Sequence, residues 1–335
     1  MDTIGRTRLV HRLAWLLVAL AWPLIWVGGL VTTYDAGMSV PDWPGTYGYN
    51  LLLYPLSTWI TGPFDIFVEH GHRLLGMVVG IVAIALLIAA WRRESRWWVI
   101  VLCFGVLLAV IGQGVLGGMR VLMSDQTLAM VHGVTGPAFF ALSTVAVVVT
   151  SPWWMRLPSD GTSGPSRSGP SRSGSLGRFA VVSAAGLVAL TYLQLVLGAL
   201  LRHAGPTTRP GIFAMITANH ILIAFVVWAV AVLVWLLVRR CGDLTLSRPG
   251  VALVTLVFVQ IGLGTATWLV NYGFPTFLRG APGSEHFLIR AKGFTESLIV
   301  TGHVATGSLI LAVATLLLVR ALRYRHVQSG IASSC

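Results

Sequence analysis

The segment GHRLLGMVVGIVAIALLIAAW, residues 71–91, decides the fold. Its only formal charge is Arg73, near its start. A helix of about 20 mostly apolar residues is long enough to cross the roughly 30 Å hydrocarbon core of a bilayer. Seven other segments meet this standard, so the sequence predicts eight transmembrane helices, at residues 13–31, 71–91, 97–117, 127–150, 178–201, 214–238, 250–271 and 295–320. The predicted fold class is therefore an all-α integral membrane protein.

The composition agrees with this prediction. Of the 335 residues, 56% are hydrophobic and only 10% are charged, whereas about a quarter of an average soluble protein is charged. A water-soluble globular domain is therefore excluded. The first span follows Arg6, Arg8 and Arg12, as the apolar part of a signal peptide would. No small-residue A-x-A site follows Val31, so we interpret this span as a retained helix.

The basic residues predict the orientation. An even number of spans places both termini on one side of the membrane. With the termini in the cytoplasm, 16 of the 23 Lys and Arg residues lie inside and 7 lie outside, as the positive-inside rule requires. Four acidic residues lie inside and seven outside, so the whole net charge of +12 is cytoplasmic. The charge is thus an orientation signal and indicates no nucleic-acid partner.

The predicted location is a bacterial plasma membrane, with the chain embedded in the lipid bilayer as a multi-pass protein. An organelle is less favoured because no Arg/Ser-rich transit segment precedes the first span.

A low-complexity segment divides the chain. Residues 157–177 contain the near-repeat GPSRSGPSRSG, and such Gly, Ser and Pro residues cannot bury enough apolar area to become ordered. We expect a flexible cytoplasmic linker between two four-helix halves, residues 1–156 and 178–335. The motif H-x-x-T-G occurs once in each half, at 132–136 and 303–307. Since both halves have four spans, the repeat predicts two bundles related by a parallel pseudo-twofold axis along the membrane normal.

A second repeat lies in the odd-numbered spans. The motif Q-x-x-L-G occurs at residues 113–117, 194–198 and 260–264. We interpret its glycines as places where helices approach closely rather than as ligand contacts.

Four of the nine histidines share one depth in the predicted membrane. His72, His132, His220 and His303 each lie within about two helical turns of the outer end of an even-numbered span. A single membrane histidine often only hydrogen-bonds to a neighbouring helix. Four at repeat-equivalent positions favour a shared role, because ionisable residues in a membrane are costly and usually functional. Any site that these histidines form is therefore predicted toward the outer face.

Two imidazoles per half suit a metal held between helices. A zinc site would normally need further ligands, and the outer side offers no cysteine. Axial ligation of a haem needs only the two histidines, with small residues making room for the ring. Four outer arginines are possible contacts for the haem propionates, or interfacial residues that reach toward the headgroups: Arg73, Arg120, Arg202 and Arg209.

One acidic residue distinguishes the two halves. Glu69 precedes His72 by three residues and shares its helical face, whereas His70 points about 160° away. The counterpart before His220, Thr217, is not acidic. This asymmetry predicts one reaction site, with Glu69 as its catalytic proton-handling group, and one cofactor site. The alternative is a glutamate that only complements the dipole at the start of its helix.

Residues 32–68 form a long outer loop that contains GMSVPDWPGTYG at 37–48. Long loops with prolines and aromatic residues often act as lids, although Trp43, Tyr47 and Trp59 could instead form an interfacial aromatic belt. We favour the lid. A second long outer loop, 271–295, has no counterpart in the first half.

The chain resembles the haem A synthase family. The resemblance rests on the loop pattern G-x-S-V-P-D-W-P-x-T-Y-G, the E-x-x-H-R of Glu69, His72 and Arg73, the Q-G-x-L-G-G of the third span, and single histidines in spans four, six and eight. It implies oxidation of the C8 methyl of haem O to a formyl group, through successive hydroxylations and loss of water.

The resemblance also implies a division of labour between the halves. His72 and His132 would be the axial ligands of the substrate, haem O, and Glu69 the acid/base group. His220 and His303 would hold a haem b that relays electrons. The implied partners are haem O synthase, a prenyltransferase, and an unidentified electron donor.

The chain departs from some bacterial members in one respect. They carry a cysteine pair in the first outer loop, whereas Cys103, Cys241 and Cys335 lie elsewhere. Redox regulation through an outer disulfide is therefore not expected.

Two other function classes fit the residues. A non-catalytic bis-histidine dihaem electron carrier would use the same four histidines but would give Glu69 no role. A transporter could use the buried histidines for proton coupling, and its preparation would be colourless.

Overall fold

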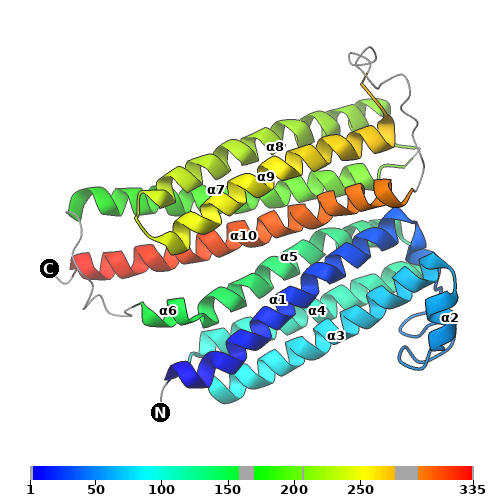
Figure 1. Ribbon diagram of the computed structural model, residues 1–335, viewed down its shortest axis with the longest axis horizontal. Helices are drawn as coiled ribbons and strands as arrows, with labels where there is room; N and C mark the ends of the chain where they lie inside the picture. Colours follow the sequence, from blue (N-terminus) through cyan, green and yellow to red (C-terminus); the bar gives the residue numbers. More distant parts are fainter. Residues whose placement is uncertain (1–2, 158–169, 206, 276–292, 334–335) are drawn as a thin grey trace.

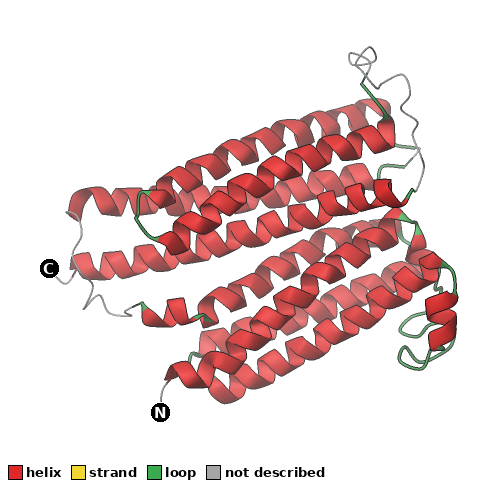
Figure 2. Cartoon of the chain, in the orientation of Figure 1, coloured by secondary structure: helices red, strands yellow, loops and turns green. Residues whose placement is uncertain are grey.

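The structure, a computed structural model, describes residues 3–157, 170–205, 207–275 and 293–333. Within these ranges the regular structure is helical (Figure 2). The predicted eight membrane-length apolar helices are confirmed. They are α1 (Thr3–Thr33), α3 (Phe64–Arg93), α4 (Trp97–Met123), α5 (Gln126–Thr150), α7 (Pro170–Arg202), α8 (Pro210–Arg239), α9 (Leu244–Tyr272) and α10 (Phe294–Ser333).

Most helices extend beyond the predicted spans. The helix predicted at 71–91 begins at Phe64, and α7 begins at Pro170, inside the predicted linker. The difference arises because hydropathy marks only the part of a helix in hydrocarbon, whereas a helix can continue through the headgroup layer. Residues 158–169 of that linker and most of the predicted loop 271–295 lie outside the described residues.

Three short helices join these spans: η1 (Ala36–Met38), α2 (Leu56–Thr61) and α6 (Pro152–Arg156). Both ends of the described chain lie at the same end of the molecule, which we call the terminal end (Figure 1). The opposite end carries η1 and α2, and we call it the loop end. Both ends of the described chain lie together because an even number of helices, eight, runs between the two ends of the molecule.

The helices form two groups of four, placed side by side (Figure 1). Helices α1, α3, α4 and α5 surround a core that includes Leu86 and Phe140, and α7 to α10 surround another that includes Leu253 and Leu317. The central spans α5 and α10 are 61% and 56% buried, whereas no other span exceeds 33%. The groups therefore meet along α5 and α10. The pseudo-twofold relation between them stays a prediction.

Polar contacts connect the groups at both ends. At the loop end, Arg202 of α7 donates to the carbonyl of Gly29 at 2.8 Å and to the hydroxyl of Thr33 at 2.7 Å, both in α1. At the terminal end, the guanidinium of Arg323 lies 5.2 Å from the centre of the Trp154 ring in α6. The two groups are thus connected at both ends of the molecule.

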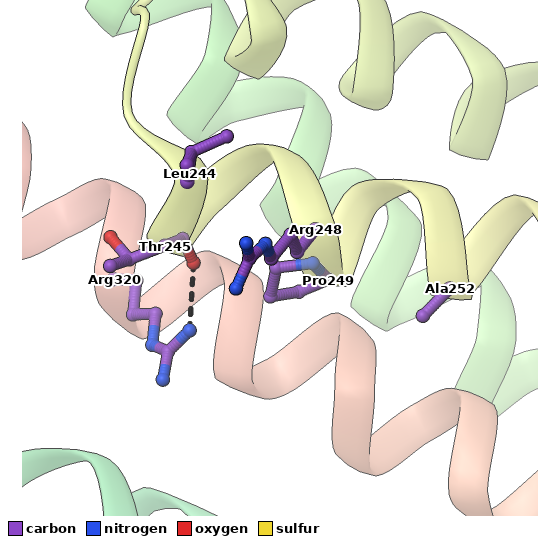
Figure 3. Close-up of a pocket in the computed structure, with 6 residues that line it drawn as sticks. All are labelled: Leu244, Thr245, Arg248, Pro249, Ala252 and Arg320. Carbon is purple, nitrogen blue, oxygen red and sulfur yellow. Dashed lines mark hydrogen bonds between the residues drawn. The ribbon is translucent and has the colours of Figure 1, made fainter.

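An open depression lies near the terminal end, at the first turns of α9 (Figure 3). Arg320 of α10 lines it and donates to the carbonyl of Thr245 at 2.7 Å. None of the predicted site residues lines this depression.

Candidate functional site

The four predicted histidines form two pairs. His72 of α3 and His132 of α5 have ring centroids 6.3 Å apart, with their planes at 89°. His220 of α8 and His303 of α10 are also 6.3 Å apart, at 69°. Each pair joins two helices of one group. The structure therefore brings together the residues that the repeat predicted as partners, at the same spacing in both halves.

The spacing fits two ligands of one metal ion. An ion bonded at about 2 Å to a nitrogen of each imidazole would place the ring centroids roughly 6 Å apart. Among the described residues, no three His, Cys, Asp or Glu side chains gather as a possible metal site. The available protein ligand sets are thus histidine pairs, which is the donor set that a haem takes on its two axial faces.

Each imidazole is seated against a glycine of the preceding span. A Cβ added at these glycines would lie only 2.8 to 3.2 Å from Cε1 of the histidine, closer than ordinary van der Waals contact. The four seats are Gly28 with His72, Gly117 with His132, Gly198 with His220, and Gly264 with His303. The glycines were interpreted as helix contacts only, and the structure shows that they also make room for the candidate ligands. Sequence reasoning missed Gly28.

A backbone group lies near each of the same rings. The neighbouring backbone belongs to the residue four positions before each glycine, namely Leu24, Gln113, Gln194 and Gln260. All four Nδ1 atoms are buried and lack a hydrogen bond of normal geometry. Metal-bound histidines commonly direct their second ring nitrogen at a backbone carbonyl. This arrangement would leave Nε2 as the nitrogen for a ligand, and it fits the predicted haem.

The glutamines of the repeated motif hold the histidine helices in place. The side-chain amides of Gln194 and Gln260 donate to the carbonyls of His220 and His303, each at 2.8 Å. Gln113 donates to the hydroxyl of Thr135 at 2.5 Å, one turn beyond His132. Beside His72, the residue four positions before the glycine is Leu24 instead of a glutamine. This seat therefore lacks the side-chain amide that the other three have.

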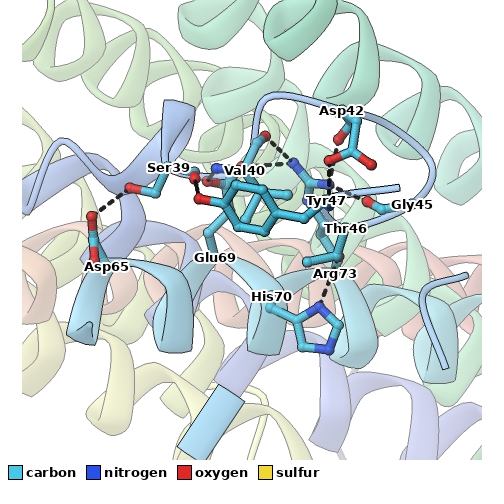
Figure 4. A network of polar contacts seen from close by, with 10 residues as sticks. All are labelled: Ser39, Val40, Asp42, Gly45, Thr46, Tyr47, Asp65, Glu69, His70 and Arg73. Atoms are coloured by element: carbon cyan, nitrogen blue, oxygen red, sulfur yellow. Dashed lines mark hydrogen bonds and ion pairs between the residues drawn. The ribbon is translucent and has the colours of Figure 1, made fainter. Parts of the chain in front are cut away.

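Glu69 and Arg73 attach the first loop to α3 (Figure 4). The Glu69 carboxylate is 2% exposed; it accepts the N–H of Val40 and pairs with Arg73, both at 2.8 Å. Arg73 also donates to the carbonyls of Val40, Asp42 and Gly45, at 2.8, 2.6 and 2.7 Å. In the described structure, the two oxygens of Glu69 thus bond to the loop and to Arg73 rather than to His72.

Further contacts fix the same loop (Figure 4). Ser39 donates to Asp65 at 2.8 Å, and the hydroxyl of Tyr47 donates to the carbonyl of Ser39. His70 is buried, and its Nδ1 lies 2.9 Å from the hydroxyl of Thr46. The loop is therefore attached to the first three turns of α3, the stretch of the helix that also carries His72.

The loop also reaches the third span, α4. A Cβ added at Gly118, next to the glycine that seats His132, would meet the ring of Trp43. One added at Gly37 would lie 2.6 Å from a guanidinium nitrogen of Arg120. These contacts with α3 and α4 support the interpretation of the loop as a lid over the N-terminal pair.

Asp42 shapes the turn within the lid. Its carboxylate accepts the N–H groups of Tyr47 at 2.7 Å and Gly48 at 2.9 Å. Partial burial alone would raise the pKa of Asp42, but the N–H groups of Gly48 and Tyr47, with the nearby Arg73, hold it below its ordinary value. Asp42 therefore stays ionised, and its charge fixes the turn at neutral pH.

The four arginines have different surroundings. The positive charges of Arg120 and Arg73 both act on His72, that of Arg120 also acts on His132, and that of Arg202 acts on His303. Arg73 is engaged by the loop, and Arg209 is exposed at the start of α8. Arg120 thus has the largest electrostatic effect among these arginines on the N-terminal pair, and Arg202 on the C-terminal pair.

Comparison with known proteins shows the family. Residues 11–209 match the family COX15-CtaA, described as cytochrome oxidase assembly protein. The heme A synthase of Shouchella clausii (strain KSM-K16) is 32% identical over 130 residues, which cover 36% of this chain and 38% of that relative. The match thus spans well under half of the relative's length. Because the family match includes the lid, the N-terminal pair and more than half of the chain, the chain belongs to the COX15-CtaA family of cytochrome oxidase assembly proteins.

Proposed function

We propose that this chain is a haem A synthase, which oxidises the C8 methyl group of haem O to a formyl group. One observation carries the proposal: two histidine pairs have the same 6.3 Å spacing, but within the part of the chain that the structure describes only the N-terminal pair lies beneath a loop that a buried carboxylate, Glu69, attaches to its helix. Two similar sites with one such carboxylate are what a reaction site and a cofactor site require. The name of the curated relative supports the same class.

In this proposal the N-terminal pair binds the substrate. His72 and His132 hold haem O from its two faces, and Arg120 meets a propionate. Each of two successive hydroxylations of the methyl carbon consumes one dioxygen as the oxidant, two electrons and two protons, and releases one water. The resulting geminal diol loses a further water to leave the formyl group. Glu69 moves protons during these steps, while Arg73 keeps the carboxylate in place. The lid excludes water from the site, which strengthens the electrostatic contacts beneath it.

The C-terminal pair supplies electrons in this proposal. His220 and His303 hold a haem b, whose iron provides one-electron chemistry when it is bound. The glycine seats, the buried Nδ1 atoms and the ring spacing of the C-terminal histidine pair fit a haem. Arg202 places a positive charge beside this site and bonds to α1 of the other half.

The setting follows from the charge distribution. We propose a bacterial plasma membrane with both termini in the cytoplasm, so that the loop end and the haem sites face outward. Haem O synthase, a prenyltransferase, would supply the substrate, and an unidentified donor would supply the electrons.

The test is pigment analysis combined with an activity assay. The purified protein is incubated with haem O, a reductant and air, and the extracted haems are identified by mass spectrometry. A haem A synthase yields hydroxylated and formyl products. The equal spacing of the two pairs favours a second candidate, a dihaem electron carrier, which would return only unmodified haem. A colourless preparation that binds no haem would contradict both and would leave the transporter.

The glycine seats provide a sharper test of the haem sites. Gly264→Ala places a Cβ 3.0 Å from Cε1 of His303, whereas Gly262→Ala, one half-turn away, meets nothing within 4 Å. Both changes favour the helix equally, by about 0.5–1 kcal/mol. We expect only Gly264→Ala to weaken haem retention in the C-terminal half, measured from the absorption spectrum after gel filtration. Equal retention in both variants would contradict the role of the seat.

A further inference from the structure

The lid contains a long segment without charge. Residues 43–64, WPGTYGYNLLLYPLSTWITGPF, include no Asp, Glu, Lys, Arg or His. Within it, four large apolar side chains are more than half exposed: Leu52 at 64%, Leu53 at 73%, Leu56 at 62% and Ile60 at 58%. Exposed apolar clusters of this kind need an apolar surrounding. Neither the polar contacts of the lid nor the proposed chemistry accounts for them.

The short helix α2 lies beside the membrane-spanning helix α3. Trp59 of α2 stacks on Phe67 at 5.7 Å and donates from its ring nitrogen to the Phe67 carbonyl at 3.0 Å. Its ring also reaches Gly71, where an added Cβ would lie 3.6 Å away. Since α3 begins at Phe64, α2 overlaps the outermost stretch of that helix, roughly 10 Å at 1.5 Å per residue.

This depth corresponds to the headgroup region. At 1.5 Å per residue, the 30 residues of α3 span about 45 Å, which matches a bilayer with its polar headgroups rather than its 30 Å hydrocarbon core. The first two turns of α3, and α2 beside them, therefore lie at the membrane surface. In Figure 1, α2 lies on the outer flank of the loop end, next to α3.

The helical period gives α2 three distinct sides. Taking Leu56 as the origin, Ile60 follows at about 40°, Ser57, Thr61 and Thr58 cover about 100° to 200°, and Trp59 lies near 300°. Trp59 faces α3. Leu56 and Ile60 thus share one side, and the three hydroxyl residues share another. An interfacial helix with apolar residues in lipid and polar residues in water has this pattern.

We propose that α2 and the preceding leucines enter the lipid layer at the loop end and anchor the lid in the membrane. The apolar surface continues onto α3 through Phe64 and Phe67, which are 45% and 40% exposed on a membrane-spanning helix. The uncharged segment begins with one aromatic residue, Trp43, and ends with another, Phe64. Aromatic residues are enriched at membrane interfaces. The lid is then held from two sides, by Glu69 and Arg73 on α3 and by lipid beneath α2.

The test measures the environment of single positions in α2. Ile60→Cys and Thr58→Cys are each made with Cys103→Ala, Cys241→Ser and Cys335→Ser, labelled with an environment-sensitive fluorophore, and placed in phosphatidylcholine nanodiscs. We expect lipids with a nitroxide high on the acyl chain to quench the label at position 60 at least about threefold more than that at 58. Iodide in the water should quench mainly the label at 58.

Leu56→Cys serves as an independent label on the apolar side, and gel filtration confirms that each variant keeps the native size. If the labels at 56 and 60 are as accessible to iodide as the label at 58, lipid does not cover this surface and the proposal is overturned. The outcome does not depend on the reaction proposed for the histidine pairs, because the measurement needs no haem.

Discussion

Glu69→Gln is expected to lower the formation of hydroxylated and formyl haem by about 100-fold or more, the usual contribution of a positioned acid/base group. The amide keeps the size of the carboxylate and can still accept the N–H of Val40, now 2.8 Å from the Glu69 oxygen. It cannot take up and release protons. The binding of haem should therefore persist, with an unchanged absorption spectrum, while turnover is lost.

A matched variant distinguishes proton handling by Glu69 from a purely structural role in attaching the lid. Asp65 is another carboxylate of α3 that attaches the lid, by accepting the hydroxyl of Ser39 at 2.8 Å. Asp65→Asn removes its charge in the same way, and we expect it to retain most of the activity. If both variants lose activity equally, Glu69 acts through the lid alone. A proton-handling role also predicts that Glu69→Gln removes a titration step from the pH profile of the residual rate.

The arrangement of helices could be predicted because its signals are local in sequence. Apolar length alone indicates a membrane span, so the eight helices were predicted correctly, although their polar ends were cut short. The pairing of His72 with His132, and of His220 with His303, followed from a repeat at a common depth. Hydropathy and sequence repeats can be recognised without knowing which helices are neighbours in the fold.

The parts that could not be predicted depend on contacts between distant segments. Arg202 bonds to Gly29, 173 positions earlier in the chain, and nothing in either local sequence indicates this. Gly28 is an ordinary glycine in an apolar helix until α1 is known to lie against His72. Arg73 was expected to be a propionate contact or an interfacial residue, but its position beside the lid provides three backbone carbonyls as partners.

The short helix α2 was also missed. Six residues are too few for a helical period to stand out from a loop, and a proline precedes them. Its sequence signal was the lack of charge over residues 43–64, which indicates a membrane interface rather than a particular secondary structure.

His303→Ala is expected to abolish haem binding in the C-terminal half while the N-terminal half keeps its ligands. The two pairs belong to separate groups of helices with separate cores, so the loss should not spread from one to the other. The matched control is His203→Ala. His203 follows the last residue of α7, belongs to neither pair, and its Nδ1 is 3.0 Å from the Ala199 carbonyl.

The distinguishing measurement is rescue by free imidazole. Removing the His303 ring leaves a space beside Gly264 of the size of the lost side chain, and imidazole in solution can occupy it as a replacement ligand. We expect imidazole to restore the low-spin absorption bands of His303→Ala, and also the product formation that needs electrons from that site. A variant that merely failed to fold would not recover. An unchanged spectrum in His303→Ala, or an equal loss in His203→Ala, would show that the pair of α8 and α10 is not the haem site.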